Sequence, residues 1–186
     1  MNGPIVHYRF TVDDYYRMAE VGILGPEARV ELLDGVIFDK PRTTPRDASC
    51  NTRLTYLFMQ KLGDLVIVSP RNPVRLDYYS EPEPDLTLLR RTDDFYSFAH
   101  PGASDVLLLV EVVDGPSDRE RALKLPLYAR HGVAEVWLID LEQRQVVVCS
   151  DPAPDGYRIV EVARPEQSLR PLAFPNLLVD LVEILG

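Results

Sequence analysis

The sequence is poor in cysteine and has no long hydrophobic run. Its 186 residues include two cysteines, Cys50 and Cys149, too few for a disulfide framework or a zinc site, and we read them as reduced thiols. No run of about 18 apolar residues occurs, so no membrane span is expected. The opening segment MNGPIVHYRF lacks the basic and apolar regions of a signal peptide. These absences favour a cytoplasmic protein.

Positive charge is also scarce. Lys and Arg number 20 against 29 Asp and Glu, which gives a formal net charge of −9. This balance argues against a protein that coats nucleic acid non-specifically, although a cleft with a local basic rim remains open. Hydrophobic residues at 46% and charged residues at 26% are ordinary for a globular protein. The length favours one domain over residues 1–186.

Sixteen prolines imply many short elements, because proline interrupts helices and sheets. The amino-terminal half predicts a helix at 10–19 with Thr11 as its N-cap, a strand pair at 29–33 and 36–38 joined by Asp34-Gly35, and an amphipathic helix at 46–63. Three short strands are expected next, at 65–68, 74–76 and 85–89.

The carboxyl-terminal half contains the most apolar segment, 105–113, whose continuous apolarity is typical of a strand buried on both faces. A helix capped by Ser117 should follow and end at His131-Gly132. The remaining elements are a strand at 133–140, a hairpin at 146–148 and 157–160, and a short helix at 177–185. The sequence thus predicts an α/β (α+β) fold, with a mixed central sheet flanked by helices and a hairpin toward each end.

Glu111 interrupts the most apolar strand. An unpaired carboxylate buried there costs several kcal/mol or takes up a proton, so such a residue usually has a cation, a metal or a catalytic task as its partner. The simpler interpretation, a salt-bridged glutamate near an exposed strand end, has about equal weight.

Three further residues become informative only together with Glu111. Asp85 alone reads as an exposed strand start, Glu31 as the solvent face of a hairpin, and Lys124 as a lysine whose stem covers apolar surface. Combined, they could converge at one end of a sheet. Two carboxylates would hold Mg²⁺ or Mn²⁺ and leave positions for water and phosphate oxygen. A nearby lysine can orient the water or neutralise developing charge.

An ordered set of segments resembles a known family over roughly residues 8 to 165. The segments are Glu31-Leu32-Leu33-Asp34-Gly35, Glu83-Pro84-Asp85-Leu86, Val110-Glu111-Val112-Val113, and Lys124 with the block from Tyr128 to Asp140. The succession resembles the Uma2 family of restriction-endonuclease-like proteins, within the PD-(D/E)XK nuclease superfamily. No single motif is specific, whereas the ordered set, and the Tyr128 to Asp140 block above all, is fairly specific.

The resemblance implies a restriction-endonuclease-like fold, with Asp85 and Glu111 as metal ligands and Glu31 as an additional acidic residue. It also implies that the lysine has moved to the following helix, so that Lys124 replaces the lysine expected at Val113. The chain departs from the family pattern in three places. Asp47 stands where a histidine is frequent, the loop after the catalytic strand is one residue shorter, and Pro126 lies in the helix that carries Lys124.

Two functional hypotheses follow. The first is a Mg²⁺- or Mn²⁺-dependent endonuclease that hydrolyses DNA, with Glu31, Asp85, Glu111 and Lys124 as its catalytic set. Five arginines are candidates for contacts with the DNA backbone: Arg42, Arg46, Arg53, Arg119 and Arg121. The second is a non-catalytic DNA- or protein-interaction module that retains the nuclease fold. A nucleotide or other phosphate ester is a weaker third substrate class, and apolar segments near both ends are compatible with a homodimer.

Overall fold

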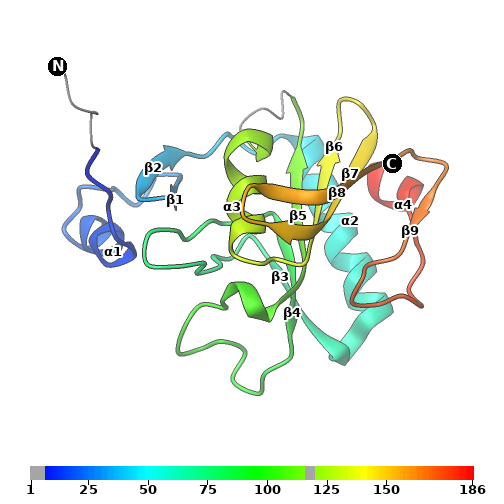
Figure 1. Ribbon diagram of the computed structural model, residues 1–186, viewed down its shortest axis with the longest axis horizontal. Helices are drawn as coiled ribbons and strands as arrows, with labels where there is room; N and C mark the ends of the chain where they lie inside the picture. The colour runs from blue at the N-terminus through cyan, green and yellow to red at the C-terminus, as the bar shows by residue number, and fades with distance from the viewer. Residues whose placement is uncertain (1–6, 116–119) are drawn as a thin grey trace.

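The computed structural model describes residues 7–115 and 120–186. At its centre is a six-stranded sheet in the order β3-β4-β5-β6-β7-β8, in which β5 and β6 are parallel and the other neighbours antiparallel (Figure 1). The strands are β3 (Val66–Pro70), β4 (Leu86–Arg90), β5 (Val106–Val113), β6 (Glu135–Asp140), β7 (Gln145–Ala153) and β8 (Gly156–Ala163). The predicted mixed sheet is confirmed, as is the hairpin formed by β7 and β8.

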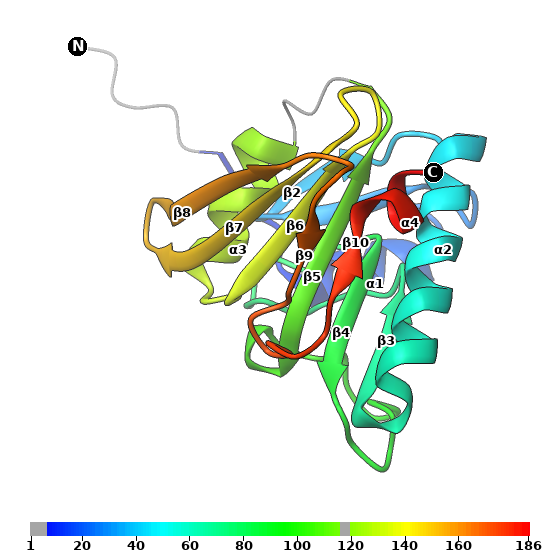
Figure 2. The ribbon, with the colours of Figure 1, turned by 90° about the vertical axis from the view of Figure 1, so that its right-hand side faces the viewer.

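Helices cover both faces of this sheet. The long helix α2 (Pro45–Leu62) packs on one face and α3 (Leu125–Arg130) on the other (Figure 2). Strand β5 is buried on both sides because alternate side chains enter two cores. Leu108, Val110 and Val112 pack in the core that contains α2, whereas Leu109 and Val113 belong to the core that contains α3. The continuous apolarity of this segment is thereby explained.

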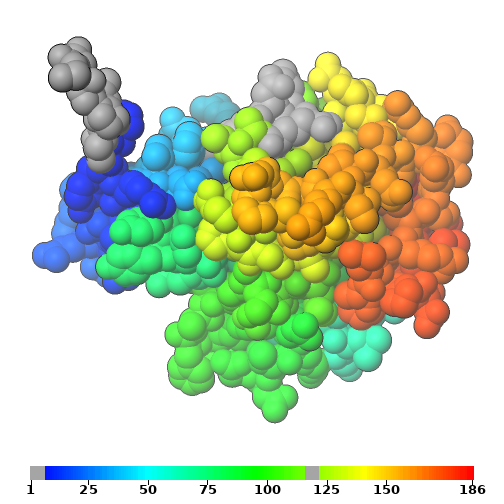
Figure 3. Space-filling model, viewed as in Figure 1, coloured from blue at the N-terminus to red at the C-terminus, as the bar shows by residue number. Residues whose placement is uncertain are grey.

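The amino-terminal elements lie at one end of the molecule, opposite the carboxyl-terminal segments (Figure 3). Helix α1 (Val12–Glu20) is capped by the Thr11 side chain, as its sequence predicts. Strands β1 (Val30–Leu33) and β2 (Val36–Asp39) form the predicted hairpin. Its turn residues Asp34 and Gly35 have φ values of 53° and 76°, the conformation that an Asp-Gly pair favours.

One predicted element is wrong, and a second is shorter than predicted. Residues 74–76 form no strand; they lie in the connection between β3 and β4, where Arg75 makes one isolated bridge with Gly102. Proline at position 73 removes a ladder donor, and the Val74 amide instead donates to the carbonyl of Pro82. In the tail, Val179–Asp180 is a short strand, β10, that pairs with β9 (Ser168–Leu169), so the helix α4 is confined to Leu181–Leu185.

The helix after β5 also differs from a regular α-helix. The predicted cap, Ser117, lies outside the described residues. From Glu120 to Lys124 the chain forms a π-helical segment, η3, which continues directly into α3. Pro126 is the second residue of α3 and has no amide to donate, and residues 120–124 before it are π-helical rather than α-helical. Two 3₁₀ turns, η1 (Gly63–Leu65) and η2 (Ala103–Asp105), precede β3 and β5.

Both cysteines, Cys50 and Cys149, are buried, and neither forms a disulfide. Among the helices of the described residues, none is long and apolar enough to cross a membrane.

A buried glutamate attaches the carboxyl-terminal segment to the sheet. Glu135 on β6 is almost fully buried, and its two carboxylate oxygens accept hydrogen bonds from Trp137 Nε1 at 2.8 Å and from the Leu172 amide at 2.6 Å. Burial raises the pKa of Glu135 above its usual value. The indole N–H of Trp137, which is fully buried, therefore depends on this carboxylate for its hydrogen bond.

We expect Glu135→Ala to lower the free energy of unfolding by about 1–3 kcal/mol, because the buried indole N–H loses its acceptor. Glu135→Gln should cost less, since one side-chain oxygen remains. Urea unfolding measures both variants, with Glu142→Ala, at an exposed position after β6, as the matched control. Equal unfolding midpoints for Glu135→Ala and Glu142→Ala would contradict this role.

Candidate active site

Two neighbouring antiparallel strands bring Asp85 and Glu111 together. The register pairs Leu86 of β4 with Val110 of β5, so Asp85, one residue before β4, lies across from Glu111. The Val112 amide donates a hydrogen bond of 2.8 Å to Asp85 Oδ2 and fixes that carboxylate at the sheet end. The two acidic residues approach because of strand register, although 26 positions separate them in the chain.

Glu111 points toward α3, because it alternates with Val110 and Val112, which face α2. There it meets two side chains that are four residues apart on the helical segment. Lys124 Nζ lies 2.7 Å from Glu111 Oε1, and the Tyr128 hydroxyl donates to the same oxygen at 2.5 Å. All three side chains are buried. The glutamate that interrupts the apolar strand thus has a cation and a hydrogen-bond donor as partners.

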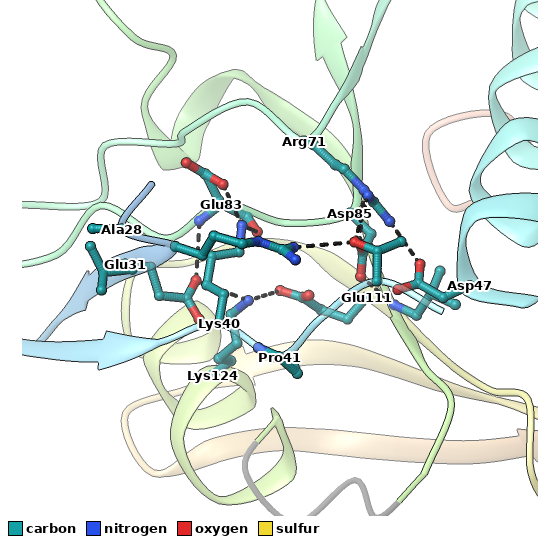
Figure 4. A pocket seen from close by; sticks show the side chains of 14 residues that line it. Ala28, Glu31, Lys40, Pro41, Asp47, Arg71, Glu83, Asp85, Glu111 and Lys124 are labelled. Atoms are coloured by element: carbon teal, nitrogen blue, oxygen red, sulfur yellow. Dashed lines mark hydrogen bonds and ion pairs between the residues drawn. The ribbon is translucent and has the colours of Figure 1, made fainter. Parts of the chain in front are cut away.

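Glu31 is the third member of this buried charge cluster. Lys124 Nζ lies 3.2 Å from Glu31 Oε2, which also accepts a hydrogen bond of 3.3 Å from the Glu83 amide. Glu31 reaches the cluster because the β1–β2 hairpin docks on the segment before β4, where Leu32 and Glu81 form a bridge. We call Glu31, Glu111 and Lys124 the buried charge cluster; Figure 4 shows their side chains converging.

Burial and the charges of neighbouring groups together set the pKa values of the cluster. Burial raises the pKa of Glu111 to about 7, against the opposing effect of the Lys124 charge. Burial alone would lower the pKa of Lys124, but the carboxylates of Glu111 and Glu31 outweigh it and raise that pKa above its usual value. Burial and the nearby Glu111 also raise the pKa of Tyr128. Lys124 is therefore an ammonium ion and Tyr128 a protonated donor at neutral pH.

A second charged group lies beside Asp85. Arg71 Nη2 lies 2.8 Å from Asp47 Oδ1, and Arg71 Nε lies 3.5 Å from Asp85 Oδ1. Asp47 is in the first turn of α2, whose cap, Thr44, accepts a hydrogen bond from the Asp47 amide. Burial, and then the charge of Asp85, raise the pKa of Asp47. Sequence reasoning missed Arg71, whose only signal is its place in a Pro-Arg-Asn-Pro turn.

These groups line one cavity of about 230 Å³ (Figure 4). Its charged lining consists of Arg29, Glu31, Lys40, Asp47, Arg71, Glu83, Asp85, Glu111 and Lys124. Glu83 is paired with Lys40. The structure thus brings Glu31, Asp85, Glu111 and Lys124 into a single site.

The donor set suits a hard divalent cation. Within the described residues no group of three His, Cys, Asp or Glu side chains stands ready to hold an ion. Two carboxylates from Asp85 and Glu111 nevertheless line the same cavity. Mg²⁺ is commonly bound by one or two carboxylates, with water and substrate phosphate completing its octahedron. The residues present therefore fit such an ion.

The five arginines expected at DNA have different surroundings. Arg42 is exposed between β2 and α2. Arg46 pairs with Asp114 at 2.6 Å and donates to the Leu141 carbonyl at 2.6 Å, and Arg53 donates to the Ile184 carbonyl at 3.4 Å. Arg119 lies outside the described residues, as does the side chain of Arg121. Their contacts with DNA remain predictions.

Comparison with known proteins identifies the family. Residues 12–182 match the model of the Uma2 family, described as "Putative restriction endonuclease". The fold is similar to the crystal structure of "a putative nuclease belonging to DUF820" from Anabaena variabilis ATCC 29413, with a TM-score of 0.73 and 14% identity over 95% of this chain and 97% of that chain. No curated protein matches the chain. Because the family model spans nearly all of the sequence, the protein belongs to the Uma2 family.

Proposed function

We propose that this protein is a divalent-metal-dependent endonuclease that hydrolyses phosphodiester bonds in DNA. The observation that carries the proposal is the convergence of Asp85, Glu111 and Lys124 on one cavity, with the lysine between two buried carboxylates. The nuclease descriptions attached to the family and to the similar fold support the same reaction class. A cavity that presents both carboxylates and cations suits a phosphate ester held beside a metal ion.

Each residue has a distinct part in this proposal. Asp85 and Glu111 would hold Mg²⁺ or Mn²⁺, which supplies Lewis-acid stabilisation of the phosphoryl charge and lowers the pKa of bound water. Lys124 Nζ would donate a hydrogen bond to the attacking water or to a phosphate oxygen. Tyr128 orients Glu111 through its 2.5 Å hydrogen bond. Glu31 acts through Lys124 and is a positioning residue.

One observation favours the non-catalytic module as a second candidate. Arg71 already pairs with Asp85, and Lys124 already pairs with Glu111. The cavity charges are therefore partly compensated by the protein's own cations, as in a site retained for its structure alone. The two candidates differ in one measurable property, which is whether a divalent ion enters the cavity and supports cleavage.

We expect wild type to cleave supercoiled plasmid or labelled single-stranded DNA with Mg²⁺ or Mn²⁺ and not with EDTA. Glu111→Gln and Asp85→Asn should each lower the rate at least about 100-fold, because losing a ligand removes several kcal/mol of transition-state stabilisation. The matched control is Glu161→Gln, at an exposed position on β8, which should cleave as wild type does. Equal cleavage by Glu111→Gln and wild type would refute the proposal. An inactive wild type that binds no Mn²⁺ would favour the module.

Lys124→Met tests the buried charge cluster without metal. Removing the lysine takes away the cation that the buried carboxylates of Glu31 and Glu111 share, so the free energy of unfolding in EDTA should fall by about 3–5 kcal/mol. Mn²⁺ should raise the stability of this variant more than that of wild type, because the ion replaces the lost positive charge. Chemical unfolding in EDTA and in Mn²⁺ measures both effects.

The control for this experiment is Lys61→Met, because both contacts of the Lys61 ammonium lie at the surface: an ion pair with Glu183 at 3.8 Å and a hydrogen bond of 3.1 Å to the Leu178 carbonyl. Its loss should cost under about 1 kcal/mol. If Lys124→Met in EDTA is no less stable than Lys61→Met, the lysine does not hold the cluster together.

A further inference from the structure

The rim of the cavity carries two arginines that neither the motif nor the mechanism above uses. Arg29 immediately precedes β1, and Arg71 immediately follows β3. Both line the cavity. Arg29 Nη2 donates to Thr43 Oγ1 at 3.2 Å, and Arg71 Nη1 donates to the same oxygen at 3.0 Å. Two guanidinium groups from distant parts of the chain therefore meet at one neutral hydroxyl.

Where they meet Thr43, the positive charges of Arg29 and Arg71 are not neutralised by a carboxylate of the described residues. Like charges repel at short range, and a hydroxyl oxygen accepts hydrogen bonds without neutralising either cation. Within the contacts of the described residues, no carboxylate pairs with Arg29. Arg71 has carboxylate partners only on its other side, where Asp47 and Asp85 lie. The space beside Thr43 is thus bordered by two forked donors and suits a tetrahedral oxyanion.

The backbone fixes the position of Arg71. Its φ angle is 51°, a left-handed conformation that is uncommon for arginine. Its amide donates to the Asp85 carbonyl at 3.1 Å. This hydrogen bond holds the backbone of Arg71 next to Asp85, just before β4, while the Arg71 side chain remains about one-third exposed. Exposed side chains change rotamer readily, so the guanidinium can move while the backbone of Arg71 stays in place.

We propose that Arg29 and Arg71 form a clamp for a phosphate group of the DNA backbone, which they hold next to Asp85 and Glu111. Thr43 sets the spacing of the two guanidinium groups. Arg71 exchanges partners: it neutralises Asp47 and Asp85 in the ion-free protein and turns to the phosphate once a divalent cation compensates those carboxylates. The clamp rests on the proposed function, since it assigns DNA as the source of the phosphate.

If Arg71 exchanges the carboxylates for a phosphate, its removal has an effect that the removal of a purely structural arginine would not have. Arg71 and a divalent cation compete for the same carboxylates, so removing Arg71 should tighten binding of the cation while weakening binding of DNA. Arg29 contacts no carboxylate among the described residues, so its removal should weaken DNA binding alone. In a protein of net charge −9, two local arginines are a substantial share of the attraction for a phosphate chain.

The test compares Arg29→Gln and Arg71→Gln with wild type and with a control, Arg164→Gln, at an exposed position after β8. Calorimetry with Mn²⁺ alone gives cation affinity. Fluorescence anisotropy with a labelled oligonucleotide in Ca²⁺ gives DNA affinity as a function of salt. We expect Arg71→Gln to bind Mn²⁺ several-fold tighter and Arg29→Gln to bind it as wild type does. Both should bind DNA about tenfold more weakly, and the slope of log affinity against log salt should fall by about one in each.

The clamp is overturned if wild type binds no DNA, if both variants bind DNA like Arg164→Gln, or if Arg71→Gln weakens Mn²⁺ and DNA binding together. The same measurements distinguish a wrong clamp from a wrong assignment of nuclease activity. If wild type binds DNA through these arginines yet leaves plasmid intact with Mg²⁺ and Mn²⁺, the clamp stands and the cleavage activity does not. If wild type cleaves DNA, and Arg29→Gln and Arg71→Gln bind and cleave DNA as well as wild type does, the nuclease activity stands and the clamp does not.

Discussion

A lysine buried between two carboxylates is the interaction on which the rest of this site depends. Lys124, Glu111 and Glu31 come from the helical segment after β5, from β5 itself and from the amino-terminal hairpin. An unpaired charge at any of these positions would cost several kcal/mol. The three elements must therefore assemble together, and the cavity in front of Asp85 exists only when they do. Docking of the hairpin is in this sense part of building the site.

Two of the cation–carboxylate groups that line the cavity differ in character. The pair of Lys124 and Glu111 is buried, oriented by Tyr128, and fixed in place. The contact of Arg71 with Asp47 and Asp85 lies at the rim, is partly exposed, and is longer on the Asp85 side. A fixed lysine suits a group that stabilises charge during reaction. An exchangeable arginine suits recognition of an incoming phosphate. The cavity thus combines a buried, fixed ion pair of Lys124 and Glu111 with a partly exposed arginine, Arg71, at its rim.

The sequence predicts those parts of the molecule that depend on local chemistry. The Asp34-Gly35 turn, the Thr11 cap and the apolarity of β5 each follow from residues close in the chain, and all three agree with the structure. The apolar residues 74–76 predict a strand, but in the structure they belong to the long connection between β3 and β4, directly after a proline. Arg71 carries no local signal because its partners Asp47 and Asp85 approach only in the folded chain. Lys124 likewise lies at the end of a π-helical segment, just before Pro126, and no pattern in the sequence predicts a π-helix there.

The proposed metal site at Asp85 and Glu111 can be tested by locating a divalent ion in the crystal. Crystals grown with Mn²⁺ would be measured at a wavelength where manganese scatters anomalously. We expect an anomalous peak bound by carboxylate oxygens of Asp85 and Glu111, with the Arg71 guanidinium turned away from Asp85. A map with no peak between Asp85 and Glu111 at saturating Mn²⁺, and with the contacts of Arg71 and Lys124 unchanged, would contradict the proposed metal site.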